Sequence, residues 1–316
     1  MTHDIEPAQT AQSELSIAIF SYNRGQYLRN LLDSISTHIP GVEVRIYDDN
    51  SDDPDTIHLL NNCGHSVYKP DKTTMNRHGN LYVNMQSALE GASTNYLIML
   101  QDDLQIIRDF SDIDLSTIQE TFENTQIGFL RPQFMRQGSY LKFLDQLILD
   151  SERDIYFPIK ESEGVEVGNA YCDVMICSVQ NLRAVNWSFE DSENGNAKKA
   201  RQIFKHMPQM FNPFIFYCPE VPCYRNRRIF LASKIASFRL KGQIIKFASM
   251  TTNEMHSFIN RNRNIPPVAE DFLRPSDSDV LYSFVFEDFR RKKFLLALYK
   301  VERRLNIIFS CYPPRN

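Results

Sequence analysis

The chain has no apolar run long enough to cross a bilayer. No segment approaches the roughly 18 consecutive apolar residues that indicate a transmembrane helix. Residues 1–14 are polar and carry Asp4, Glu6 and Glu14, so they lack the basic and apolar regions of a secretory signal peptide. We therefore expect a flexible lead over residues 1–14 and a cytoplasmic protein.

Internal repeats, low-complexity segments and a strong net charge are also missing. The 35 basic and 39 acidic residues give a net charge of −4 at pH 7, which is too small to indicate a nucleic-acid partner for the whole molecule. Hydrophobic residues make up 42% and charged residues 23% of the chain, as in ordinary globular proteins. A length of 316 residues is enough for one large domain or two modest ones.

Cysteine is scarce and scattered. Cys172 and Cys177 have four residues between them, as have Cys218 and Cys223, which leaves a zinc site open in principle. However, residues 171–177 resemble a strand, in which side chains five positions apart face opposite sides. We therefore favour buried free thiols, which fit a reducing cytoplasm.

The first 130 residues alternate between strand-like and helix-like segments, the pattern of a mainly parallel α/β sheet. The expected strands are residues 15–20, 42–47, 66–68, 96–100 and 127–130. Helices are expected after residue 25, from Asp53, through residues 83–89 and from Asp114.

The pattern is weaker after residue 135. Strands are expected at residues 171–177 and 214–218, and helices at residues 197–207 and 287–309. Residues 224–263 hold nine Lys or Arg against the single acid Glu254. This stretch could be a solvated face, a site for diphosphate or an anionic acceptor, or a contact with an anionic membrane.

Two acidic clusters directly follow strand-like runs. The first begins with Asp48 and Asp49, and the second consists of Asp102 and Asp103 after residues 96–100. Ligands of open α/β sheets bind just outside the carboxyl ends of the strands. Carboxylates placed twice at that edge indicate a nucleotide and a divalent cation, although either cluster alone could be a solvated turn.

The order of these segments resembles glycosyltransferase family 2. The resemblance rests on the Ser-Tyr-Asn-Arg loop at residues 21–24, the acidic turn at residues 48–52 and the pair Asp102-Asp103. It covers residues 15–108 well and becomes thin afterwards. It implies a nucleotide-diphospho-sugar transferase fold, with a Rossmann-like, mainly parallel sheet and a helical C-terminal extension.

The resemblance also implies roles for individual residues. Asp49 matches the acid that accepts a hydrogen bond from a pyrimidine ring N–H, Asp102 the residue that touches ribose, and Asp103 the ligand of Mn²⁺ or Mg²⁺. The remaining residues that match the nucleotide-binding positions are Ser21, Tyr22, Asn23, Asp71 and Arg77. Gln101 departs from the family pattern, in which many members have an acid or a small residue.

Transfer of a sugar to a hydroxyl also needs a general base. The resemblance implies an acid from the later part of the domain and inversion at the anomeric carbon. The acidic turn after Trp187 offers Glu190, Asp191 and Glu193, of which we favour Glu193 and then Asp191. Simple capping of the next helix is the alternative, and His206 or His256 could add a metal ligand.

These expectations define a metal-dependent, inverting glycosyltransferase that uses a UDP- or dTDP-sugar. The acceptor is expected to be a glycan, a lipid-linked sugar or a protein. We expect a catalytic domain at residues 15–225, with a nucleotide-binding half (15–110) and an acceptor half (111–225), and a basic extension at 226–316. The extension's last helix could dock on the protein or lie at the inner face of the membrane.

Two rival interpretations are kept. A catalytically degenerate transferase fold could serve as a binding or scaffold protein, because the match weakens after residue 135. A sugar-1-phosphate nucleotidyltransferase is disfavoured because the chain lacks a glycine-rich, basic phosphate loop near its start.

Overall fold

The computed structural model describes most of the chain, and its described residues form two compact units. The described residues are 11–70, 79–143, 147–158, 170–204, 206–219, 221, 230–232, 234–235, 244–276, 283–285 and 293–310. Unit 1 comprises Met1–Phe216 and Ala248–Leu273, and unit 2 comprises Tyr217–Phe247 and Arg274–Asn316. Asp71, Arg77, Cys223 and Cys311 lie outside the described residues.

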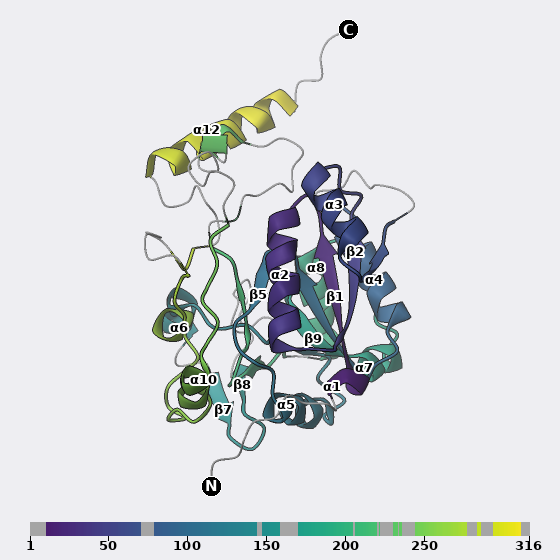
Figure 1. Ribbon diagram of the computed structural model, residues 1–316, viewed down its shortest axis with the longest axis vertical. Helices are drawn as coiled ribbons and strands as arrows, with labels where there is room; N and C mark the ends of the chain where they lie inside the picture. Colours follow the sequence, from purple (N-terminus) through teal and green to yellow (C-terminus); the bar gives the residue numbers. More distant parts are fainter. Residues whose placement is uncertain are drawn as a thin grey trace. The chain divides into compact units, whose positions relative to one another are not determined.

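Unit 1 is built on a six-stranded sheet with the strand order β3-β2-β1-β4-β9-β6 (Figure 1). Its strands are β1 (Leu15–Ser21), β2 (Glu43–Asp48), β3 (Ser66–Tyr68), β4 (Tyr96–Gln101), β6 (Phe129–Leu130) and β9 (Met175–Ser178). The strands β1 to β4 run parallel, whereas β9 runs antiparallel between β4 and β6. The predicted fold class, a mainly parallel α/β sheet, is confirmed.

The remaining elements of the two units are helices and short strands. The helices are α1 (Ala11–Glu14), α2 (Gly25–His38), α3 (Pro54–Asn62), α4 (Leu81–Gly91), α5 (Asp112–Phe122), α6 (Gln137–Phe143), α7 (Val179–Ala184), α8 (Glu193–Ile203), α10 (Thr252–Ile259), α11 (Ala269–Phe272) and α12 (Lys293–Ser310). The short strands are β5 (Leu104–Ile106), β7 (Leu147–Asp150), β8 (Ile155–Pro158), β10 (Gln209–Met210) and β11 (Ile215–Tyr217).

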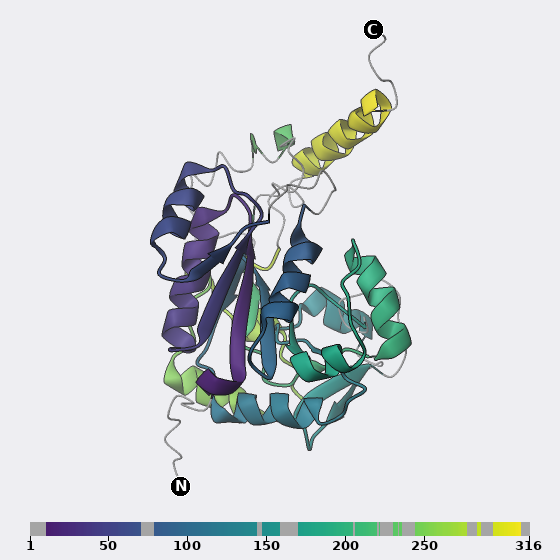
Figure 2. The ribbon, with the colours of Figure 1, turned by 90° about the vertical axis from the view of Figure 1, so that its right-hand side faces the viewer.

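The alternation of side chains along β1 separates two cores. Ala18 and Phe20 belong to a buried cluster with residues of α4 and α8, so Ile17 and Ile19 face the other side of the sheet. Helices α2 and α3 cover that other side, and α4 lies on the face of the cluster (Figure 2). Because both faces are covered, every residue of the central strand β1 is buried, rather than every second one.

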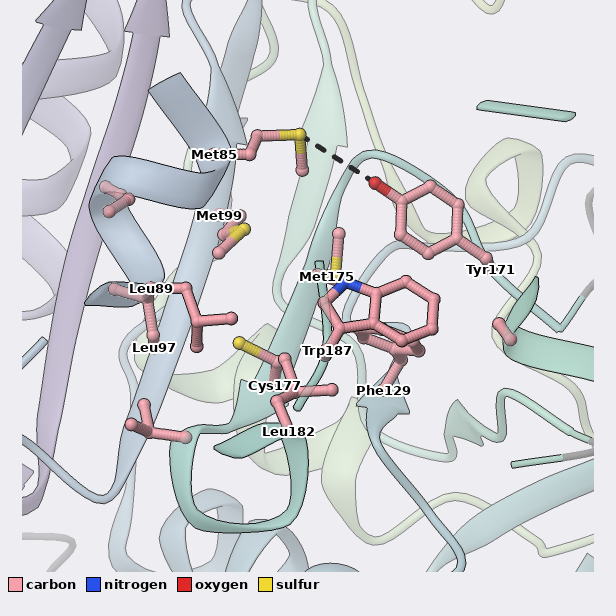
Figure 3. Close-up of a cluster of buried hydrophobic side chains, with 14 of the residues drawn as sticks. Met85, Leu89, Leu97, Met99, Phe129, Tyr171, Met175, Cys177, Leu182 and Trp187 are labelled. Atoms are coloured by element: carbon pink, nitrogen blue, oxygen red, sulfur yellow. Dashed lines mark hydrogen bonds between the residues drawn. The ribbon is translucent and has the colours of Figure 1, made fainter. Parts of the chain in front are cut away.

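The buried cluster is rich in methionine and aromatic side chains (Figure 3). Trp187, the single tryptophan of the chain, is 4% exposed and packs edge-on against Phe129, with 5.1 Å between the ring centroids. The Tyr171 hydroxyl lies 3.8 Å from the sulfur of Met85 on α4. Trp187 is therefore part of the core that holds α8 against the sheet.

The second half of the chain departs from the sequence-based boundaries. Strand β9 begins only at Met175, because Cys172 lies in the preceding loop, where its thiol bonds the carbonyl of Val174 at 2.8 Å. Helix α8 begins at Glu193, four residues earlier than expected, because the Ser192 side chain caps it.

The domain boundary expected at residue 226 differs from the division of the structure into two units, in which unit 2 begins at Tyr217. Residues 248–273 belong to unit 1. They do so because Phe258 and Val268 are buried there and the Met135 amide bonds the carbonyl of Pro267 at 2.9 Å.

The described cysteines are Cys63, Cys172, Cys177 and Cys218, of which the first three are free thiols. Burial raises the pKa of Cys177 to about 12 and that of Cys172 to about 11. Among the described helices, none is both long and apolar enough to cross a membrane.

Candidate functional site

The two acidic clusters meet at one edge of the central sheet. Ser21 at the end of β1 pairs with Asp48 at the end of β2, and Phe20 pairs with Gln101 at the end of β4. The ladder continues one step beyond the strands, because the amide of Asp49 bonds the carbonyl of Ser21 at 2.9 Å. Parallel pairing therefore brings residues about 50 positions apart to neighbouring places.

Arg24 joins the two carboxylates that follow β4. Its Nη1 donates to Oδ1 of Asp102 at 3.1 Å and also to Oδ2 of Asp103. Asp102 Oδ2 accepts a further hydrogen bond from the backbone N–H of Tyr22 at 3.0 Å. All three charged side chains are almost fully buried, so this is a desolvated triad of two acids and one base.

Burial dominates the electrostatics of this triad. It raises the pKa of Asp102 to about 6, and the negative charge of Asp103 adds to that rise. The guanidinium of Arg24 and the amide of Tyr22 oppose it by stabilising the ionised carboxylate. Two buried carboxylates side by side therefore depend on a positive charge between them.

The oxygen atoms at this edge fit a divalent cation that takes its remaining ligands from a bound molecule. Carboxylate oxygens are the hard ligands that Mn²⁺ and Mg²⁺ prefer. Ser21 Oγ is buried at the same edge and has no hydrogen-bond partner among the described residues. Within the described residues no group of three or more His, Cys, Asp or Glu could hold a metal, so protein side chains alone do not form a complete cage there.

Asp49 lies at the start of helix α4 rather than in open solvent. Its Oδ2 accepts a hydrogen bond from the backbone N–H of Asn80 at 3.1 Å, and its Oδ1 accepts one from the Asn80 side chain at 2.6 Å. Gly79 packs so closely that an added Cβ would lie 2.0 Å from Asp49 Oδ2. The carboxylate is thus oriented by the positive end of α4.

Asn23 holds the first loop against the acidic turn. Its side-chain oxygen accepts from the amides of Asp52 and Asp53, at 2.9 and 3.0 Å, and its Nδ2 donates to the Asp52 carboxylate at 2.6 Å. Its backbone has a φ of 53°, in the left-handed region that asparagine tolerates. Asn23 therefore shapes the loop that carries Tyr22, which is half-buried.

The sequence did not single out Asp173, which the fold brings to the same edge. The antiparallel register pairs Met99 with Met175, so continuing it two residues places Asp173 beside Gln101. Its carboxylate is 7% exposed and accepts a hydrogen bond from the Tyr82 hydroxyl at 3.2 Å. An acid that precedes an antiparallel strand has no local signal, because its position depends on the register.

The acidic turn after Trp187 is rigid. The buried side chain of Asn196 accepts from the amide of Glu190 at 2.8 Å and donates to the carbonyls of Glu190 and Ser192. The carboxylate of Glu190 lies 3.3 Å from Lys199 Nζ, which also bonds Ser188. The carboxylate of Glu190 therefore forms an ion pair at the surface.

Glu193 and Asp191 are both exposed, but they differ in their surroundings. The negative charge of Glu193 contributes to raising the pKa of Cys172, after burial as the main cause. Glu193 therefore lies within electrostatic range of the Cys172–Asp173 loop, which approaches the sheet edge. Ser192 caps α8, so helix capping does not require Glu193 itself.

The two histidines considered as metal ligands belong to no cluster of potential metal ligands among the described residues. His206 and His256 are half-buried, and neither belongs to a group of three potential ligands among the described residues.

The comparison with protein families finds a match in the first half of unit 1. Residues 16–126 match the family described as Glycosyl transferase family 2. This match contains the first loop, Asp49 and the Asp102-Asp103 pair. It confirms the predicted resemblance to this family over these residues. No curated protein sequence is significantly similar to the chain.

Several solved structures are similar to part of the chain. Residues 1–349 of S. aureus TarS, in complex with UDP, are 15% identical, with a TM-score of 0.46, and the alignment covers 78% of this chain and 69% of that one. The mannosyltransferase PcManGT from Pyrobaculum calidifontis, in complex with GDP-Man and Mn²⁺, is 12% identical, with a TM-score of 0.44 and coverage of 67% and 58%. The chain spans 42% of the longer S. aureus TarS structure.

Proposed function

We propose, on the premise that residues 16–126 belong to glycosyltransferase family 2, that this protein transfers a sugar from a UDP- or dTDP-sugar to a hydroxyl group with inversion. The acceptor is a glycan, a lipid-linked sugar or a protein. The observation that carries the proposal is the meeting of Asp49, Asp102 and Asp103 at the carboxyl edge of β1, β2 and β4.

The preference for a pyrimidine donor rests on Asp49. Its two oxygens accept hydrogen bonds from Asn80, which orient a carboxylate of the kind that accepts a bond from a ring N–H. Uracil and thymine carry such an N–H. A partly buried acceptor discriminates strongly against a base that leaves it without its partner.

Asp103 is the residue that would hold Mn²⁺ or Mg²⁺ together with diphosphate oxygens, and Asp102 beside it would contact the ribose. When bound, such a cation neutralises the negative charge that the leaving nucleoside diphosphate gains. Arg24 contacts the same two carboxylates and holds them in place for the ligand. Ser21 and Tyr22 line the adjacent end of β1, and Asp71 and Arg77 complete the proposed nucleotide-binding set.

Glu193 is proposed as the general base that removes the proton from the acceptor hydroxyl. It is exposed to an incoming acceptor, and the Asn196 network fixes the turn from which it projects. Attack by the activated oxygen on the face opposite to the leaving diphosphate inverts the anomeric carbon in one displacement. Asp191 is the second choice for this role.

The compartment proposed for this reaction is the cytoplasm. Among the described residues, Cys63, Cys172 and Cys177 are free thiols, as in proteins of a reducing compartment.

Turnover of a donor panel tests the proposal. The purified chain is incubated with UDP-, dTDP- and GDP-sugars, with and without Mn²⁺, and release of the nucleoside diphosphate is measured. We expect Mn²⁺-dependent release from a UDP- or dTDP-sugar, even without an acceptor, through slow hydrolysis. Tight UDP binding with no release from any donor, also in the presence of glycan acceptors, would favour the binding or scaffold role instead.

A further inference from the structure

Helix α12 of unit 2 exposes an apolar stripe. Phe294, Val301 and Leu305 are 71%, 54% and 46% exposed. At about 100° per residue, these three side chains fall within about 40° of one another around the helix. An aromatic and two branched side chains on one line form a continuous apolar strip rather than isolated surface residues.

The neighbouring face of α12 packs against other residues of unit 2. Leu295 is buried against Ala232, and Tyr299 packs edge-on against Phe230 with 4.9 Å between ring centroids. Glu302 accepts hydrogen bonds from the amides of Leu231 and Ala232, at 2.8 and 3.2 Å. These contacts fix the rotation of the helix, so the stripe is held outward.

The other flank of the stripe is positively charged. Lys293, Lys300 and Arg304 lie about 80–120° from the stripe, on the side away from the packed face. The acid within the described side chains of this helix is Glu302, and its carboxylate is occupied by the two backbone amides. The free flank of α12 therefore presents cations without a compensating acid of its own.

We propose that α12 binds an anionic membrane surface, with Phe294, Val301 and Leu305 inserted at the level of the acyl chains. Long basic side chains beside such a stripe extend to the lipid phosphates while their stems stay in the apolar layer. The segment packed on α12 adds exposed Leu231 and Ile235 and the exposed cation Lys234. This inference rests on unit 2 and is independent of the proposed transferase activity.

Charge favours a membrane over a second copy of the chain. Antiparallel two-fold pairing of two stripes would bring the same cationic flank of both copies together, which is repulsive. Anionic headgroups instead attract each Lys or Arg near the surface.

Vesicle binding of the full chain tests the proposal. Cosedimentation is measured with vesicles of phosphatidylcholine alone and of phosphatidylcholine mixed with phosphatidylglycerol. We expect binding to the anionic vesicles, weakening with added salt, and little binding to the neutral ones. The double variant Lys300→Gln/Arg304→Gln should bind roughly 25-fold more weakly, at about fivefold per cation. Phe294→Ser should weaken binding by about tenfold or more.

Matched variants control for general changes of surface. Leu141→Ser removes another exposed apolar side chain, 64% exposed on α6, and Arg29→Gln removes an exposed cation on α2. Neither should change vesicle binding. Absence of binding to anionic vesicles, or equal binding to neutral ones, would overturn the proposal. So would a dimer in sedimentation equilibrium that Phe294→Ser dissociates, because the stripe would then be an interface between copies.

Discussion

Asn80 donates two hydrogen bonds to the carboxylate of Asp49, one from its backbone N–H at 3.1 Å and one from its side chain at 2.6 Å. The acid predicted to recognise the base is thereby fixed to the residue that precedes α4. In the proposed site, a single carboxylate would therefore couple recognition of the nucleotide to the position of this helix.

Gly79→Ala should damage both stability and nucleotide binding. A φ of +61° costs an alanine about 1–2 kcal/mol, and its Cβ would lie 2.0 Å from Asp49 Oδ2. Gly64→Ala is the matched control, because Gly64 has a φ of +73° but nothing within 4 Å of an added Cβ. Urea denaturation should show a loss in both variants, whereas UDP affinity should fall only in Gly79→Ala. Equal UDP affinity of the two variants would contradict the assignment of Asp49.

Asp49→Asn should reduce the preference for pyrimidine nucleotides. The substitution replaces one acceptor oxygen by an NH₂ donor, which would face either an Asn80 N–H or the ring N–H instead of accepting from it. Calorimetry should show that the wild-type protein binds UDP or dTDP more tightly than GDP and that the variant loses most of this difference. Tighter binding of GDP by the wild-type protein would refute the donor preference.

Arg24→Gln should destabilise the fold and make its stability depend on a divalent cation. Removing the guanidinium leaves two buried carboxylates without their partner, which costs about 3–5 kcal/mol. Mn²⁺ should then raise the midpoint of thermal unfolding more in the variant than in the wild-type protein, because it replaces the lost charge. Arg29→Gln, an exposed change on helix α2, which directly follows Arg24, should behave as wild type. An equal Mn²⁺ response in all three proteins would show that Mn²⁺ does not bind at these carboxylates.

Glu193→Gln should preserve donor binding and lower turnover by roughly a hundredfold or more, the scale of a lost general base. Asp191→Asn and Glu190→Gln are the matched controls on the same turn, and Glu190 already pairs with Lys199. Initial rates with a saturating donor separate the three variants. If turnover falls in Asp191→Asn and stays near normal in Glu193→Gln, the role belongs to Asp191. If no variant matters, the base lies on another element.

The first 130 residues were predictable because each local signal agrees with the fold. Apolar runs such as residues 96–100 can only be buried strands, and Asp53 with Pro54 at the start of α3 is a direct capping signal. Both acidic clusters follow such strands, so their convergence at one edge followed from parallel pairing.

The rest of the site depends on contacts that a sequence does not display. Strand β9 has four residues and runs antiparallel, so neither its register nor the place of Asp173 has a periodic signal. Arg24 stands in a loop that resembles a nucleoside contact, yet its partners lie about 80 residues away. Asn23 is predicted at a nucleotide-binding position, and the sequence did not show that its side-chain oxygen also accepts from the amides of Asp52 and Asp53.

Calorimetric titration of UDP, with and without Mn²⁺, tests the central claim that the edge formed by β1, β2 and β4 is a metal-assisted donor site. The wild-type protein should bind UDP more tightly when Mn²⁺ is present. Asp103→Ala should lose this enhancement by at least about tenfold while keeping a cooperative unfolding transition, because the metal loses its carboxylate. Unchanged UDP affinity of Asp103→Ala in the presence of Mn²⁺ would contradict the account.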